Sequence, residues 1–123
     1  MPQDRVLEKQ IKDAIGAHGL WKSRLVGAID TGKADVSVET AGSGTQCAFG
    51  KWLGGVKPAG TQSASHAKVK QLHDAFHRVA ANVLAHATAG RKTEASKAIA
   101  SNGEFDRASF ALTREMMAWL KAA

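Results

Sequence analysis

The sequence predicts an all-α protein, a four-helix bundle in an up-and-down arrangement with a short extra helix that carries a cysteine. Apolar residues recur every three or four positions in three long stretches, which is typical of helices that bury one face. Glycine-rich stretches at positions 41–44 and 54–60 separate these segments. Val36 and Val38 would suit a strand, but they are too few to build a sheet.

The first helix is expected from Asp4 to about Ile29. Asp4 is a suitable N-cap residue, and Gly32 is a suitable stop because glycine readily adopts the conformation that ends a helix. A short helical segment is expected near residues 45–53, where glycines lie on both sides.

Two further helical stretches are expected in the second half of the chain. The first runs from about residue 61 to 88 and should end at Gly90. The last runs from about residue 92 to 121, and Asn102-Gly103 should kink or interrupt it.

Length and composition favour one domain over residues 1–123. An apolar fraction of 44% and a charged fraction of 23% are near the averages of globular proteins. The single cysteine, Cys47, excludes an intramolecular disulfide. No apolar run approaches the roughly 20 residues that cross a bilayer, and the N-terminus has no apolar signal-peptide core. We therefore expect a soluble, cytoplasmic protein without a membrane partner.

The net charge of +6 raises the question of nucleic-acid binding. Lysines and arginines are spread from Arg5 to Lys121, and the longest basic run is Arg91-Lys92. Because a dense basic patch is missing, we expect a solvated surface and no nucleic-acid partner.

His18 lies on the apolar face of the first expected helix, seven residues after Ile11 and seven before Leu25. A buried imidazole needs a partner, because burying it unsatisfied is costly. Taken alone, this position is more typical of a core histidine bonded to a nearby carbonyl than of a metal ligand.

His73 and His77 are four positions apart, so a helix places both rings on one face, where they can chelate one ion. This spacing alone is a weak signal, but both residues share an apolar face. His66 lies roughly 10 Å along the helix from His73, and His86 is about half a turn off that face. We expect both to stay outside any metal site.

Cys47 opens the short helical segment, with Gly44 or Thr45 as the expected cap. Near a helix N-terminus, the helix dipole and free N–H groups favour the thiolate, which is the form that binds metal or reacts. The alternative is a small buried hydrophobic residue, a common role for a lone cysteine.

Together, these side chains offer three imidazole nitrogens and one sulfur, which suits tetrahedral zinc. We therefore predict a zinc site formed by His18, Cys47, His73 and His77. Four protein ligands leave no position for a catalytic water, and no glutamate stands beside the histidines as a general base. The sequence favours a sensor or regulator over an enzyme and predicts no catalytic residues.

The sequence resembles the chemoreceptor zinc-binding domain family in three ordered blocks. His18 is followed closely by the bulky Leu20, Cys47 opens a Cys-x-Phe-Gly-x-Trp block that ends at Trp52, and His73 opens a late His-x-x-x-His. The blocks follow one another with the spacing of the family over nearly the whole chain.

This resemblance implies a zinc cofactor, held by three histidines and one cysteine inside a four-helix bundle. It implies a bacterial cytosolic domain, commonly a homodimer, that is free-standing or attached to a signalling protein such as a chemoreceptor or a diguanylate cyclase. The implied roles are zinc sensing and a redox response to oxidants such as hypochlorous acid at the zinc-bound Cys47, which we expect to be the movable ligand.

Three other interpretations stay open at this point. A metal-dependent hydrolase would keep an open coordination position and cleave simple esters. A di-iron or haem bundle would be coloured, and the di-iron type needs Glu-x-x-His pairs that this sequence lacks. A metal-free helical interaction module would contain no zinc.

Overall fold

A computed structural model describes residues 2–34, 36–43, 47–55 and 62–122. All regular elements in these ranges are helices, so the all-α prediction is confirmed. They are α1 (Pro2–Thr31), α2 (Val38–Gly42), α3 (Ala48–Gly55), α4 (Gln62–Thr88), α5 (Lys92–Ile99) and α6 (Glu104–Ala122).

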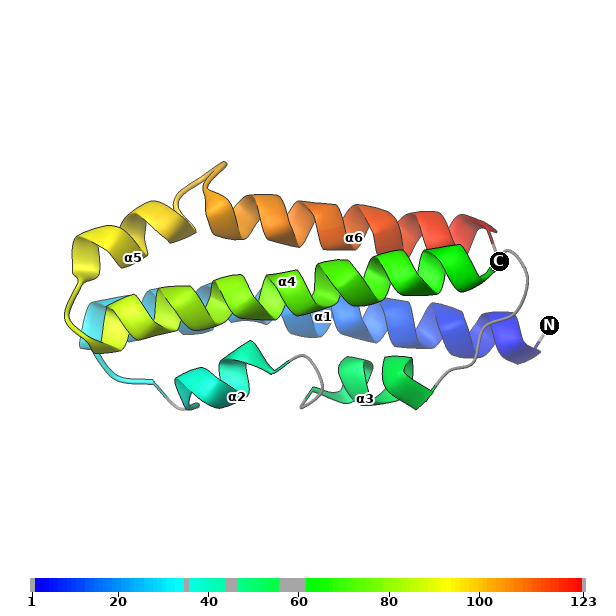
Figure 1. Ribbon diagram of the computed structural model, residues 1–123, viewed down its shortest axis with the longest axis horizontal. Helices are drawn as coiled ribbons and strands as arrows, with labels where there is room; N and C mark the ends of the chain where they lie inside the picture. The colour runs from blue at the N-terminus through cyan, green and yellow to red at the C-terminus, as the bar shows by residue number, and fades with distance from the viewer. Residues whose placement is uncertain (1, 35, 44–46, 56–61, 123) are drawn as a thin grey trace.

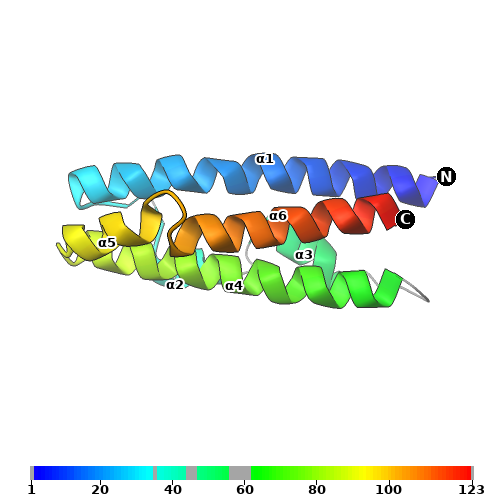
Figure 2. The same ribbon diagram turned by 90° about the horizontal axis from the view of Figure 1, so that it is seen from above.

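The helices form a bundle of four rods, two of which are continuous and two segmented. The helices α1 and α4 are the continuous rods, and α5 and α6 lie end to end along one side of them (Figure 1). The short helices α2 and α3 lie end to end along the opposite side, and both contact α4 (Figures 1 and 2). The predicted bundle with a short helix beside the cysteine is therefore confirmed.

The first helix starts earlier than predicted and ends where predicted. The predicted start at Asp4 is wrong, because α1 begins at Pro2. Proline suits this position, since its fixed φ is helical and a first-turn N–H would have no partner inside the helix. At the other end, Gly32 has φ 74° and donates its N–H to the Ala28 carbonyl at 2.7 Å, which confirms it as the stop.

The interruption in the last helical stretch is also confirmed. The helix α5 ends at Ile99 and α6 begins at Glu104, with Asn102 at φ 63° between them. A Cβ at Gly103 would lie 2.8 Å from the Ala100 carbonyl oxygen, so only glycine fits this turn. Gly90, at φ 80°, ends α4 as predicted.

The sequence reading missed α2, whose first residue looked like part of a strand. Ser37 caps this helix, because its hydroxyl oxygen accepts the Thr40 N–H at 3.1 Å. The helix then packs closely on α4, where a Cβ at Gly42 would lie 3.1 Å from the Ala81 Cβ. A residue without a side chain lets the two backbones come this near.

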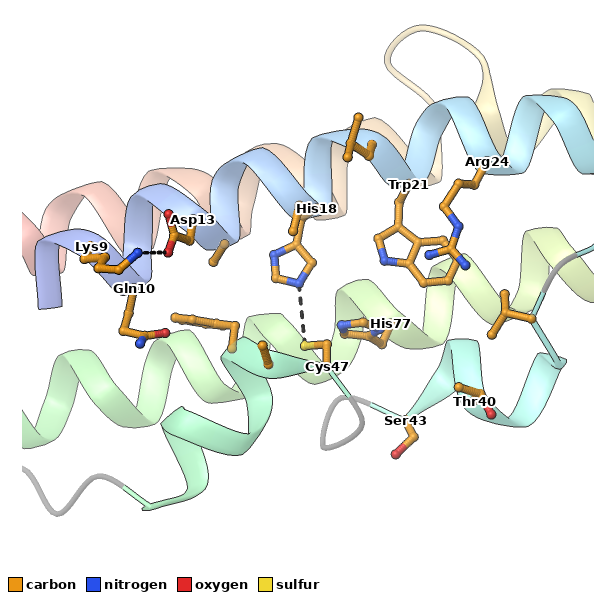
Figure 3. Close-up of a pocket in the computed structure, with 16 residues that line it drawn as sticks. Lys9, Gln10, Asp13, His18, Trp21, Arg24, Thr40, Ser43, Cys47 and His77 are labelled. Carbon is orange, nitrogen blue, oxygen red and sulfur yellow. Dashed lines mark hydrogen bonds and ion pairs between the residues drawn. The ribbon is translucent and has the colours of Figure 1, made fainter. Parts of the chain in front are cut away.

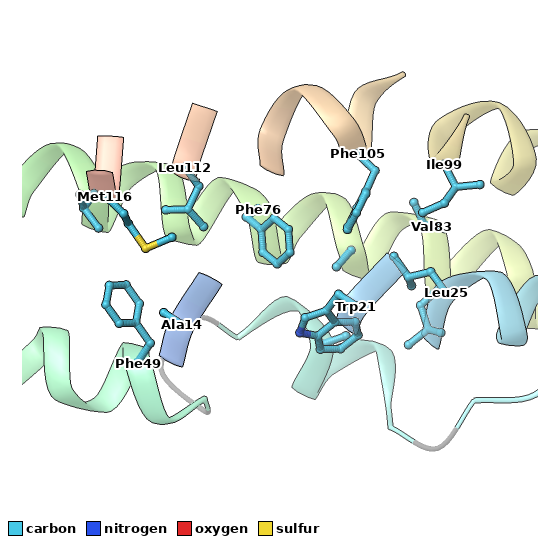
Figure 4. Packing of buried hydrophobic residues seen from close by; sticks show 14 of the residues in the cluster. Ala14, Trp21, Leu25, Phe49, Phe76, Val83, Ile99, Phe105, Leu112 and Met116 are labelled. Carbon is cyan, nitrogen blue, oxygen red and sulfur yellow. The ribbon is translucent and has the colours of Figure 1, made fainter. Parts of the chain in front are cut away.

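The apolar faces of the helices meet in one continuous core. Four residues labelled in Figure 4 are fully buried: Leu25 of α1, Phe76 and Val83 of α4, and Met116 of α6. Burying one such side chain is worth about 2 kcal/mol, so this packing holds the rods in register. Among the described residues, no helix combines the length and the apolar character needed to cross a membrane.

Candidate metal centre

His18 enters the core from the middle of α1 and is 6% exposed. Its Nε2 lies 3.2 Å from Nε2 of His73. It also lies 3.9 Å from Sγ of Cys47, the contact that a dashed line marks in Figure 3. The other ring nitrogen, Nδ1, is buried, and no hydrogen bond to it is found among the described residues. The Nε2 side of the ring therefore faces His73 and Cys47.

His73 and His77 project from successive turns of α4 and are 1% and 2% exposed. Their Nε2 atoms are 3.1 Å apart. His77 Nδ1 donates to the Ala41 carbonyl of α2 at 3.0 Å, and a carbonyl can only accept. The proton of the neutral ring therefore sits on Nδ1, and Nε2 presents a lone pair toward His73.

Cys47 is itself the N-cap residue of α3. Its carbonyl accepts the Lys51 N–H at 3.0 Å, and its sulfur accepts the Gly50 N–H at 3.3 Å. The expected caps, Gly44 and Thr45, lie outside the described residues. The sulfur is 3.3 Å from Nε2 of His73, so the start of α3 places the Cys47 sulfur beside the histidines.

The structure brings together all four side chains that the sequence selected. One ligand atom from each of His18, Cys47, His73 and His77 lies within 4.8 Å of the other three. Tetrahedral zinc with standard bond lengths would separate two nitrogens by about 3.3 Å and a nitrogen and a sulfur by about 3.6 Å. The nitrogen–nitrogen contacts of 3.1 and 3.2 Å are slightly shorter than the first value, and the nitrogen–sulfur contacts of 3.3 and 3.9 Å lie on either side of the second.

The electrostatics of the site keep the imidazoles neutral. The pKa of His18 is lowered to about 4 and that of His73 to about 3, mainly by burial and to a smaller extent by the charge that His77 would carry. Burial also lowers the pKa of His77, against smaller upward effects of the Ala41 carbonyl and of Asp74. At neutral pH, lone pairs are therefore available, which is the form of histidine that binds metal.

The donor set suits zinc more than the other metals that the sequence left open. Three imidazole nitrogens and one cysteine sulfur are a donor set that zinc binds. No carboxylate belongs to the group within the described part of the chain, whereas a di-iron site requires several.

A cavity of about 670 Å³ opens beside the site, between α1 and the α2–α3 side of the bundle (Figure 3). His18, Cys47 and His77 contribute to its lining. Trp21 forms part of the wall, with the Arg24 guanidinium 4.2 Å from the centre of its ring. Cys47 is only partly buried and belongs to the wall of this cavity.

Aromatic residues near Cys47 pack against the histidines of the site. The Phe49 ring stands edge-on to His73 and His18, with ring centres 5.2 and 6.1 Å apart. The Trp52 ring lies 5.7 Å from Phe49. Trp21 similarly stands edge-on to His77 at 6.1 Å.

The other two histidines lie outside the group. His66 bonds to the Leu53 carbonyl at 2.7 Å, and His86 accepts from the Arg91 guanidinium at 2.9 Å. The sequence did not predict that the Ala41 carbonyl accepts the Nδ1 hydrogen of His77. A backbone atom leaves no residue signature, so only the buried position of α2 against α4 reveals it.

Comparison with known proteins agrees with this geometry. The family model described as "Chemoreceptor zinc-binding domain" matches residues 18–84, more than half of the chain. The matched range begins at the first of the four grouped residues and includes the other three. No significant match was found to a curated protein or to a solved structure.

Proposed function

This chain belongs to the chemoreceptor zinc-binding domain family, and we propose that it is a zinc-dependent sensory domain of bacterial signalling. His18, Cys47, His73 and His77 are the proposed ligands. The observation that carries the proposal is the convergence of three buried imidazoles and one thiol within 4.8 Å. Apolar residues at these positions would pack without the free-energy cost of removing three imidazoles from water. A bound metal ion would offset that cost, so the grouping indicates a metal site.

Cys47 is the proposed movable ligand. The three histidines project from the two continuous helices α1 and α4, whereas Cys47 stands at the start of the eight-residue α3. When bound, zinc would supply a positive charge that stabilises the thiolate and draws the four ligands together. Loss of the sulfur contact would leave the histidines in place and free the start of α3, which changes the surface of the bundle on that side.

The opening beside the site suits a redox input. The Cys47 thiolate would react with hypochlorous acid that enters through the cavity, forming an S–O bond and releasing chloride. Sulfur is oxidised by two electrons, the chlorine is reduced, and the hydroxyl proton stays on the sulfenic acid. A sulfenic acid is a poorer metal ligand than a thiolate, so the reaction would detach α3.

The output is proposed to pass to a chemoreceptor or a diguanylate cyclase in the bacterial cytosol. Residues 1–123 would act as one such domain, alone or joined to its partner, and pair as a homodimer. The role is regulatory and not enzymatic, because the four grouped side chains include no separate base to activate a water.

Metal analysis tests the proposal directly. We expect one zinc per chain in protein purified without added chelator. Cys47→Ala and His73→Ala should each lower the zinc affinity by at least about tenfold while the far-ultraviolet circular dichroism stays helical. His86→Ala is the matched control and should bind zinc like the wild type.

Two results would contradict the proposal. Zinc-free protein that also fails to take up zinc would favour a metal-free interaction module. Zinc-dependent ester hydrolysis that survives Cys47→Ala would instead favour a hydrolase.

A further inference from the structure

The end of α3 opposite Cys47 is held by a side chain outside the metal centre. His66 of α4 donates its Nε2 hydrogen to the Leu53 carbonyl at 2.7 Å. Leu53 lies in the last turn of α3, where backbone carbonyls have no partner within the helix. The contact therefore joins α4 to α3 through a backbone group that needs a donor.

Packing holds His66 in this position. Its ring stands edge-on to Trp119 of α6, with ring centres 5.9 Å apart and an angle of 89° between the planes. Trp119 also lies 6.0 Å from Trp52 of α3. Trp119 thus contacts His66 of α4 and Trp52 of α3, the two helices that the His66–Leu53 hydrogen bond joins.

The two attachments of α3 match two points on one face of α4. His66 and His73 are seven positions apart, or about 10 Å along the helix axis. Cys47 and Leu53 are six positions apart, or about 9 Å. The Cys47 sulfur lies 3.3 Å from His73 while the Leu53 carbonyl meets His66, so α3 runs antiparallel to α4 and is held at both ends.

We propose that His66 is a positioning residue that sets the zinc affinity by anchoring α3. The inference rests on the proposed zinc site and assigns a role to a histidine that does not bind the metal. With the far end of α3 held, the Cys47 sulfur stays near the three imidazoles before zinc arrives. Binding then orders less of the chain, which raises affinity through pre-organisation.

Two variants of similar size separate the hydrogen bond from packing. His66→Gln keeps an N–H donor that can reach the Leu53 carbonyl, whereas His66→Leu keeps the bulk against Trp119 and cannot donate. Zinc dissociation constants are measured by competition with a chromophoric chelator. We expect His66→Leu to bind zinc about tenfold more weakly than His66→Gln, and His66→Gln to remain close to the wild type.

A second background shows whether His66 acts through Cys47. In Cys47→Ala protein, His66→Leu and His66→Gln should bind zinc equally, because α3 then carries no ligand to position. Cobalt(II) in place of zinc gives an independent readout, since its thiolate charge-transfer band should weaken in His66→Leu and persist in His66→Gln. A general loss of stability would instead lower affinity in both backgrounds.

Equal zinc affinities of His66→Leu and His66→Gln would overturn the inference, as would a difference that persists in Cys47→Ala protein. If His66→Leu does not fold, His66→Asn is used in its place, because the shorter asparagine side chain carries an N–H donor that cannot reach the Leu53 carbonyl. Zinc binding that depends on Cys47 but not on position 66 would refute this inference alone. A wild-type chain that binds no zinc would refute the proposed function as well.

Discussion

The metal-free protein should lose stability steeply in mild acid, because the bundle holds buried histidines in their neutral form. Unfolded histidines protonate near pH 6.5, whereas folded His18 and His73 protonate only near pH 4 and pH 3. Below pH 6.5, the unfolded state therefore binds more protons than the folded state. Stability is full above this pH and falls as the pH drops toward the folded values.

The size of the effect follows from these pKa values. The pH of 5 lies about 1.5 units below the pKa of an unfolded histidine, so protonation stabilises the unfolded state by about 2 kcal/mol per histidine. His18 and His73 together then remove about 4 kcal/mol, a large part of the 5–15 kcal/mol that is typical of a small domain. The lowered pKa of His77 adds to the loss in the same direction.

Urea denaturation in the presence of a chelator, at pH 7.5 and at pH 5, measures this difference. His73→Gln should remove about 2 kcal/mol of the pH dependence. A free energy of unfolding that changes by less than about 1 kcal/mol between these pH values would contradict this expectation. It would mean that the imidazoles are hydrated or charged in the folded protein.

Three further predictions concern packing and metal. Gly42→Val should destabilise the protein by about 1–3 kcal/mol and weaken zinc binding, because the new side chain meets Ala81 and displaces the Ala41 carbonyl from His77. Gly27→Ala is the control, because the space around a Cβ at Gly27 is open. Equal behaviour of the two variants in urea and zinc titrations would contradict this prediction. Phe76→Ala should lower the free energy of unfolding by about 3–5 kcal/mol, since the ring is fully buried, and a loss below about 1 kcal/mol would show a core that readily collapses. Zinc at a thousand times its dissociation constant should stabilise the wild type by about 4 kcal/mol, seen as a higher midpoint of thermal unfolding that a chelator reverses; an unchanged midpoint would speak against binding to the folded state.

Helical periodicity predicts most of this fold, because the apolar residues of each long helix recur every three or four positions in the sequence. The same periodicity places His18 on the core-facing side of α1 and puts His73 and His77 one turn apart on α4. Glycines at positive φ, such as Gly32, mark helix ends in the sequence as they do in the structure.

Other features depend on contacts that no residue pattern records. The five-residue α2 is too short to show a period, and the close approach of Gly42 to Ala81 holds it in place. The Ala41 carbonyl reaches its histidine through a backbone atom, which any residue could supply. Cys47 caps α3 with its own sulfur, a role that depends on where the chain turns.

Zinc-edge X-ray absorption on the metal-loaded protein reports the atoms around the ion itself. A site formed by Cys47 and three histidines predicts one sulfur at about 2.3 Å and three nitrogens at about 2.0 Å, with the sulfur lost in Cys47→Ala. A first shell without sulfur in the wild type would contradict it.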